Sequence, residues 1–178
     1  LVPAAVEACA RKGAAGVEIL SSGFRELGTD EGAALEERLR AIAATGTRVI
    51  GPNCFGVVNM LNGLVLPFFV LEPAYVRQGG VSLVSQSGTM LGTVLSRGAA
   101  RGLGFAKLVS VGNEADLDIS DVMGFMIDDE LVAAHRRRRG FGILASISGE
   151  GGAVLQLIED LARVLKRLLL SVWRSREE

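Results

Sequence analysis

The sequence predicts an α/β protein in which a parallel sheet carries helices on both faces. Short apolar runs rich in β-branched residues, such as 17–20 and 81–84, alternate with stretches that repeat apolar residues every three or four positions. Glycine, serine, asparagine or proline separates most of these segments from the next. This alternation is typical of a three-layer fold whose ligands bind outside the carboxyl ends of the strands.

The composition fits a packed protein and argues against several classes. The 178 residues are 49% apolar and 22% charged, which suits one large domain or two small ones. The 19 Lys and Arg residues balance 20 Asp and Glu residues. This balance argues against a surface patch that binds nucleic acid or a membrane. Only two cysteines occur, and neither a transmembrane run nor a signal peptide is visible, so we expect a cytoplasmic protein. Leu1 begins a chain that we interpret as part of a longer one.

Residues 1–72 are expected to form a first α/β unit. Pro3 suits the first turn of a helix over residues 3–13, and Thr29 or Asp30 can cap a second helix that ends near residue 46. The strands of this unit are expected at 17–20 and 48–50. Polar loops follow them at 21–24 and 51–56.

Residues 60–79 contain turn residues without a sustained period, so they predict a connection between domains, which we place after residue 72. Residues 73–178 are expected to form a second unit of the same kind. Its strands are expected at 81–84, 106–111, 142–147 and 168–173. Its helices are expected at 88–100, 118–128 and 152–167.

The turn Ser85-Gln86-Ser87-Gly88-Thr89 follows the first of these strands and opens a helix. The first backbone N–H groups of a helix lack partners within it and lie at the positive end of its dipole, so the turn is a candidate phosphate site. The commoner alternative is that Ser87 only caps the helix. No Asp or Glu occurs between residues 81 and 101 to repel an anion.

Other polar segments have plainer interpretations. The loop that contains Asn53 and Cys54 predicts a tight turn with a buried thiol. Acidic residues at 114, 116, 118 and 121 match no known cation loop, and Asp118 suits a helix cap, so no metal is expected. His135, the only histidine, precedes an arginine run and is interpreted as a surface residue. The loop at Glu150 is either a flexible connection or one that places this carboxylate near a reacting group.

Five short strings in this order resemble the nucleoside-diphosphate-forming acyl-CoA synthetases, a superfamily that includes succinyl-CoA ligase α subunits and ADP-forming acetate–CoA ligases. The strings are VPAA at 2–5, SGFRELG at 22–28, GPNCFG at 51–56, VSQSGT at 84–89 and SVGNEAD at 110–116. The acetate–CoA ligase branch, with its acetyltransferase fusions, looks closer than the succinate branch.

The resemblance implies the C-terminal part of a Rossmann-like CoA-binding domain over residues 1–72 and a flavodoxin-like ligase domain over residues 73–178. The residues that it implies for CoA binding are Val2, Pro3, Ser22, Gly23, Phe24, Asn53 and Cys54, the last two near the CoA thiol. Those that it implies for phosphate binding are Ser85, Gln86, Ser87, Gly88 and Thr89. It also implies a carboxylate that faces a phosphohistidine, either at Glu150 or in the register of Ser148.

The implied reaction is acid plus CoA plus ATP to acyl-CoA, ADP and phosphate, through an acyl phosphate and a phosphohistidine. His135 does not match the position of that histidine, and residues 171–177 resemble the segment that precedes it. Mg²⁺ with ATP or ADP would bind outside this chain, to an ATP-grasp domain or subunit, and an oligomer is implied. We therefore expect this chain alone to be inactive and to bind CoA weakly. The alternatives are a CoA-sensing regulatory module, as in the acetyltransferase fusions, and an inactive homologue.

Overall fold

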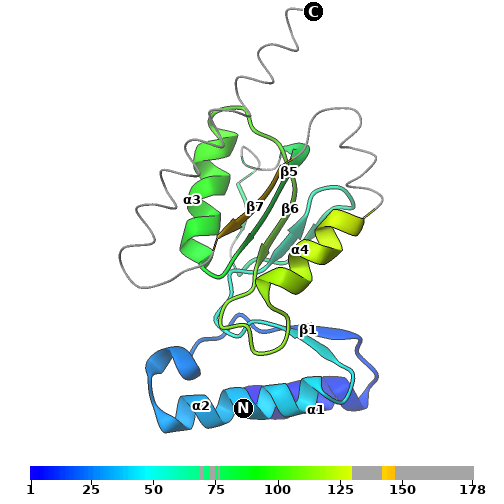
Figure 1. The fold of residues 1–178 in the computed structure, drawn as a ribbon, viewed down its shortest axis with the longest axis vertical. Coiled ribbons are helices and arrows are strands. Elements are labelled where there is room, and N and C mark those ends of the chain that lie inside the picture. The colour runs from blue at the N-terminus through cyan, green and yellow to red at the C-terminus, as the bar shows by residue number, and fades with distance from the viewer. Residues whose placement is uncertain (69, 73–74, 76, 130–141, 147–178) are drawn as a thin grey trace, which may run out of the picture.

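The structure, a computed structural model, describes the chain except for residues 69, 73–74, 76, 130–141 and 147–178. Its helices and strands confirm the predicted α/β class (Figure 1). The helix and strand expected after residue 150 lie outside the described residues, as do His135, Ser148 and Glu150.

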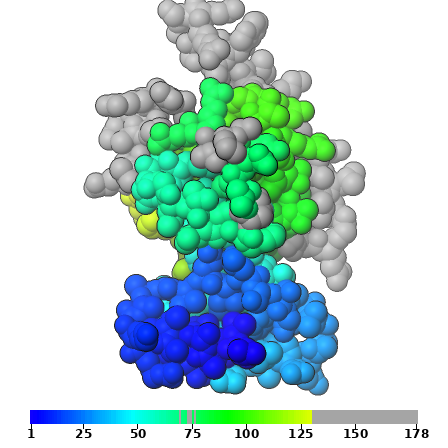
Figure 2. Space-filling model, turned by 180° about the vertical axis from the view of Figure 1, so that it is seen from behind, coloured from blue at the N-terminus to red at the C-terminus, as the bar shows by residue number. Residues whose placement is uncertain are grey.

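The first sheet contains two short parallel strands, β1 (Gly16–Glu18) and β2 (Arg48–Ile50). Two helices, α1 (Val2–Arg11) and α2 (Asp30–Ala43), lie beside this sheet (Figure 1). The blue N-terminal segments gather at one end of the molecule, and the green segments of the second sheet at the other (Figure 2). The core of the first part consists of Val6, Ile19, Phe24, Leu39, Ile42, Ala43, Val49 and Ala115. Ala115 comes from a loop far along the chain, so the first fifty residues do not complete this core by themselves.

The start of α2 is fixed by the loop after β1. A short 3-10 helix, η1 (Arg25–Leu27), leads into α2. Thr29 is the N-cap, and its side chain accepts a hydrogen bond from the Gly32 N–H at 3.1 Å. A Cβ on Gly32 would lie 2.1 Å from the carbonyl oxygen of Phe24, so only glycine allows α2 to begin this close to the loop.

The second sheet has the strand order β4-β3-β6-β5-β7 among the described residues. Its strands are β3 (Val57–Asn59), β4 (Leu64–Val65), β5 (Gln78–Ser85), β6 (Phe105–Ser110) and β7 (Gly142–Ser146). β5 lies between β6 and β7 and is parallel to both, which confirms the predicted parallel arrangement for these three strands.

The hairpin β3–β4 was not predicted and makes the sheet mixed. β3 is antiparallel to both β4 and β6, with Val58 opposite Leu108 in the latter pair. Both strands of the hairpin precede residue 73, although they belong to the second sheet. The division after residue 72 stays a prediction, because sheet membership alone does not define a domain.

Helices α3 (Gly88–Ala99) and α4 (Ile119–Asp128) cover opposite faces of the second sheet (Figure 1). Successive residues of β5 serve the two faces in turn: Leu83 belongs to the core under α3, and Val84 to the core under α4. Val81 to Val84 are all buried, as the unbroken apolar run predicts for a central strand. The carboxyl end of β5 therefore opens between two helix layers.

Candidate functional site

The turn from Ser85 to Gly88 joins the carboxyl end of β5 to α3, as predicted. Ser87 is the N-cap of α3, and its hydroxyl accepts a hydrogen bond from the Met90 N–H at 3.2 Å. The hydroxyl of the buried Ser85 donates to the Ser87 carbonyl oxygen at 3.0 Å and accepts from the Ser87 N–H at 3.1 Å. The two serines thus hold the turn in one conformation.

Two backbone donors remain at the start of α3. Among the described residues, the N–H groups of Gly88 and Thr89 have no hydrogen-bond partner. Gly88 is half-buried and Thr89 is exposed, so a ligand can approach from solvent. Free N–H groups at the positive end of a helix can bind an anion.

Phe55 lies against this end of α3 and requires glycine there. A Cβ on Gly88 would lie 2.8 Å from the Cβ of Phe55, and a Cβ on Gly92 would lie 3.2 Å from its Cε2. The ring of Phe55 also meets that of Phe68 edge-on, with centroids 5.7 Å apart. Since Phe55 belongs to the loop after β2, two of the predicted site loops are in direct contact.

The loop between β6 and α4 contacts the same region. The Asn113 N–H donates to the Pro52 carbonyl oxygen at 2.9 Å, and the Ala115 N–H donates to the Gly51 carbonyl oxygen at 3.1 Å. Gly112 has a φ of 58°, and a Cβ there would lie 2.1 Å from the Pro52 oxygen. Glycine at this position therefore permits close contact between the two loops.

The structure brings a carboxylate to the turn that sequence reasoning did not place there. Glu114 accepts a hydrogen bond from the Gln86 side-chain amide and another, at 3.0 Å, from the Ile119 N–H. Asp118 caps α4 and forms a capping box with Asp121, as expected for a structural role. Nowhere in the described part of the chain could three or more His, Cys, Asp or Glu side chains together hold a metal ion.

The loop after β1 is organised by Glu26. Its carboxylate accepts hydrogen bonds from the N–H groups of Gly23, at 2.6 Å, and Phe24, at 3.2 Å. Partial burial alone would raise the pKa of Glu26, but hydrogen bonds from Asn113 and from these N–H groups outweigh it and lower that pKa. Ser22 is exposed, whereas the Phe24 side chain is buried in the first core.

The loop after β2 presents Asn53 and buries Cys54. Asn53 is exposed, has a φ of 57°, and donates its N–H to the Ser21 carbonyl oxygen at 2.9 Å. The Cys54 thiol donates to the Ile19 carbonyl oxygen at 3.3 Å. Burial and the nearby Glu18 carboxylate raise the pKa of Cys54 to about 12. The buried-thiol interpretation is thus correct, and the role of Cys54 in CoA binding stays a prediction.

Val2 and Pro3 lie in the first turn of α1. A short connection joins the end of α1 to the start of β1, so the N-terminus of α1 lies toward the carboxyl ends of the first sheet. Pro3 is buried, and Val2 packs against the first core. Of the seven residues predicted for CoA, those with accessible surface are Val2, Ser22, Gly23 and Asn53. The CoA-binding role of all seven residues stays a prediction.

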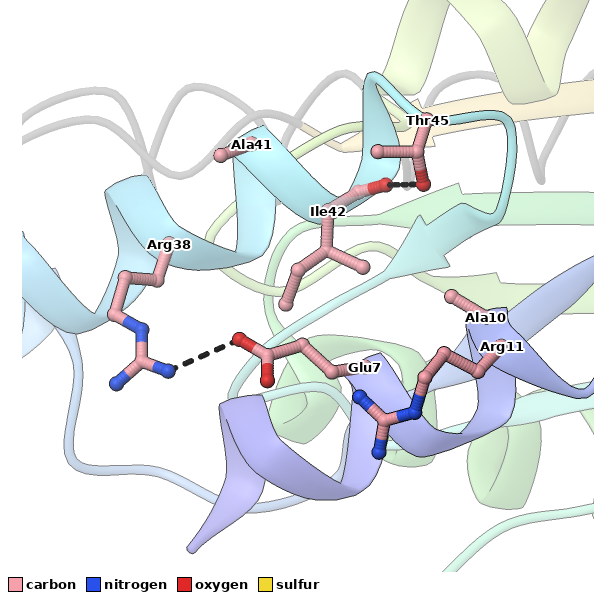
Figure 3. Close-up of a pocket in the computed structure, with 7 residues that line it drawn as sticks. All are labelled: Glu7, Ala10, Arg11, Arg38, Ala41, Ile42 and Thr45. Carbon is pink, nitrogen blue, oxygen red and sulfur yellow. Dashed lines mark hydrogen bonds and ion pairs between the residues drawn. The ribbon is translucent and has the colours of Figure 1, made fainter.

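A separate open groove of about 400 Å³ lies between α1 and α2. Figure 3 shows its lining side chains, with Arg38 directed at Glu7, which it meets at 3.0 Å. The groove contains none of the predicted site residues. Glu7 lies in α1 and Arg38 in α2, so their exposed ion pair joins the two helices across the groove. We therefore assign the groove to the packing of α1 on α2.

Comparisons with known proteins identify relatives of this chain. Residues 78–135 match the family described as succinyl-CoA ligase like flavodoxin domain. The chain is 40% identical over 131 residues to an ADP-forming acetate–CoA ligase of Methanocaldococcus jannaschii, covering 73% of this chain and 18% of that protein. It is 41% identical over 177 residues to the α subunit of ADP-forming acetate–CoA ligase I of Pyrococcus furiosus, covering 98% of this chain and 36% of that subunit.

A solved structure shows the same fold. An acetyl-coenzyme A synthetase of Candidatus Korarchaeum cryptofilum, in complex with phosphate and ADP, superposes with a TM-score of 0.70 and 29% identity. The match covers 90% of this chain and 32% of that one. The chain thus spans well under half the length of each of these three proteins. Within the described ranges, every helix is too short or too polar to cross a membrane.

Proposed function

Because this chain belongs to the superfamily of nucleoside-diphosphate-forming acyl-CoA synthetases, we propose that it supplies CoA-binding and phosphate-binding loops to an ADP-forming acid–thiol ligase. The proposed whole reaction joins a carboxylic acid to CoA and converts ATP to ADP and phosphate. An ATP-grasp domain or subunit would bind the nucleotide with Mg²⁺. A small carboxylic acid, or its acyl-CoA, is the proposed second substrate.

In this proposal different loops bind phosphate and CoA. The N–H groups of Gly88 and Thr89 and the positive end of α3 would hold a phosphate. Ser85 and Ser87 would keep those donors in place, and Gln86 would be held by Glu114. The loop from Ser22 to Phe24, with Asn53, would contact CoA.

One observation carries the proposal: the two loops of the first sheet and the two of the second meet at one place. Phe55 packs on the start of α3, and Asn113 donates its N–H to Pro52. Acyl transfer to a thiol requires the acyl group and the thiol to come together. The contact between the proposed phosphate loop and the proposed CoA loops therefore supports the proposal.

A phosphate titration followed by amide NMR tests the proposal. We expect the Gly88 and Thr89 amides to shift most, and Thr89→Glu to weaken binding at least about fivefold, since like charges about 4 Å apart repel by about 1 kcal/mol even in water. Thr93→Glu is the matched control, because Thr93 is exposed one turn further along the same helix. If phosphate shifts other amides and leaves Gly88 and Thr89 in place, the proposed phosphate role of the turn is wrong.

The Gly88→Asp variant gives a second test and should abolish binding by adding both charge and bulk. Gly88→Ala separates these effects, since its Cβ meets Phe55 in the same way but carries no charge. Binding by Gly88→Ala that exceeds binding by Gly88→Asp would assign the loss to charge. An equal loss in both variants would assign it to the contact with Phe55, whereas parent-like binding by both would contradict the proposed phosphate contact.

A further inference from the structure

We propose that Asn113 and Glu114 are positioning residues that fix the loop at residues 22–24 relative to the turn at residues 85–88. This inference rests on the proposed function, in which the first loop contacts CoA and the second holds phosphate. The two residues are neighbours in the loop between β6 and α4. Asn113 contacts the first loop through Glu26, and Glu114 contacts the turn through Gln86.

Asn113 reaches the first loop through Glu26. Its side-chain amide donates to Glu26 Oε2 at 2.5 Å and to Glu36 Oε2 at 3.0 Å. The other carboxylate oxygen of Glu26 holds the Gly23 N–H at 2.6 Å. Asn113 is therefore separated from the backbone of the first loop by a single side chain.

Glu36 anchors this contact on a helix. Its side chain is fully buried, in α2, and also accepts hydrogen bonds from Arg25 at 3.1 Å and Arg40 at 3.2 Å. A buried carboxylate is costly unless all its neighbours are in place, so the group resists displacement. Asn113 also accepts a hydrogen bond from the Asn53 side chain at 3.3 Å.

Glu114 reaches the turn through Gln86. One carboxylate oxygen accepts from the Gln86 side-chain amide, and the other accepts from the Ile119 N–H at the start of α4. The Ser110 hydroxyl, at the end of β6, also donates a hydrogen bond to the Gln86 carbonyl oxygen at 3.5 Å. The turn is thereby tied to α4 as well as to α3.

Asn113 and Glu114 are adjacent in the chain, so the two contacts are joined by a single peptide unit. Gly112 and Glu114 both have positive φ, 58° and 59°, and Asn113 between them donates its N–H to Pro52. We infer that a displacement of Gln86 passes through Glu114 to Asn113 and from there to Glu26. Because a misplacement of about 1 Å can cost about a hundredfold in rate, such a connection matters when two reacting groups must meet.

Amide NMR of the ligand-free chain tests the connection. Gln86→Glu sets two carboxylates against each other, and we expect it to shift the amides of Gly23 and Phe24 as well as those of the turn. The double variant Gln86→Glu/Glu114→Gln exchanges the two side chains and restores both hydrogen bonds, since the amide now at position 114 can donate to the carboxylate at position 86 and still accept from Ile119. It should return these shifts toward the parent values. Adding Asn113→Ala to Gln86→Glu should leave Gly23 and Phe24 unaffected by the change at position 86.

Glu7→Gln is the control, because it exchanges a carboxylate for an amide in the groove between α1 and α2, which contains none of the predicted site residues. It should leave both loops unshifted. Where Gln86→Glu folds poorly, Glu114→Gln alone should give the same pattern at smaller amplitude, since one amide oxygen cannot satisfy both donors. Shifts confined to the turn, or shifts at Gly23 that persist with Asn113→Ala, overturn the inference. No ligand is used, so this failure differs from a failure of phosphate to bind at Gly88 and Thr89.

Discussion

Gly112→Ala is expected to destabilise the protein by about 3–4 kcal/mol. An L-residue at a φ of 58° costs about 1–2 kcal/mol. The new Cβ would lie 2.1 Å from the Pro52 carbonyl oxygen, which is backbone and cannot rotate away. The loops must separate, and the hydrogen bonds from the N–H groups of Asn113 and Ala115, at 2.9 and 3.1 Å, are then lost at about 1 kcal/mol each.

Gly63→Ala is the matched control. Gly63 has a φ of 78°, but a Cβ there would meet nothing within 4 Å. Both variants share the conformational cost and the entropy change of the unfolded chain, so their difference of about 2 kcal/mol isolates the loop contact. Urea unfolding with an unchanged m-value measures it. A difference below about 0.5 kcal/mol would refute the contact between residue 112 and Pro52.

Three further predictions concern the titratable groups. Burial raises the pKa of Glu18 to about 7. The protonated side chain therefore contributes stability that is complete below pH 4.5 and is lost as the pH rises through 7. In Glu18→Gln, the urea midpoint should decline less between about pH 5 and pH 8 than in the parent protein. Cys54 should react with a thiol reagent only on unfolding, whereas the half-buried Cys9 reacts in the native protein; fast labelling of both would contradict the burial. Asp116→Asn, which removes the ion pair with Arg48 at 2.9 Å, should lower stability by about 1 kcal/mol at neutral pH, measured by the same unfolding, and an unchanged midpoint would contradict it.

Local chemistry was predictable wherever a few adjacent residues decide it. Ser87 and Asp118 are N-caps because each has a short polar side chain directly before an apolar helical repeat. The strand over 48–50 is confirmed with the predicted bounds. The hairpin β3–β4 was missed because its strands are only three and two residues long, although Asn62-Gly63 is a hairpin signal.

The contacts that join the site could not be predicted in the same way. Asn113 meets Glu26 and Glu36, which lie 87 and 77 positions away in the sequence. In the sequence, nothing distinguishes Glu114 from the other acidic residues of its loop, and only the fold places it beside Gln86. Such pairs depend on how the two sheets are placed, and no local pattern encodes that placement.

The support that residues 115–117 give to the first sheet has a consequence for synthesis. The Val49 N–H donates to the Asp116 carboxylate at 2.8 Å, and the Leu117 N–H donates to the Val49 carbonyl oxygen at 3.1 Å. A ribosome releases β1 and β2 well before this segment, and two strands of three residues are marginal by themselves. The two strands therefore emerge without the segment that stabilises them, and about seventy more residues must be translated before residues 115–117 can contact Val49.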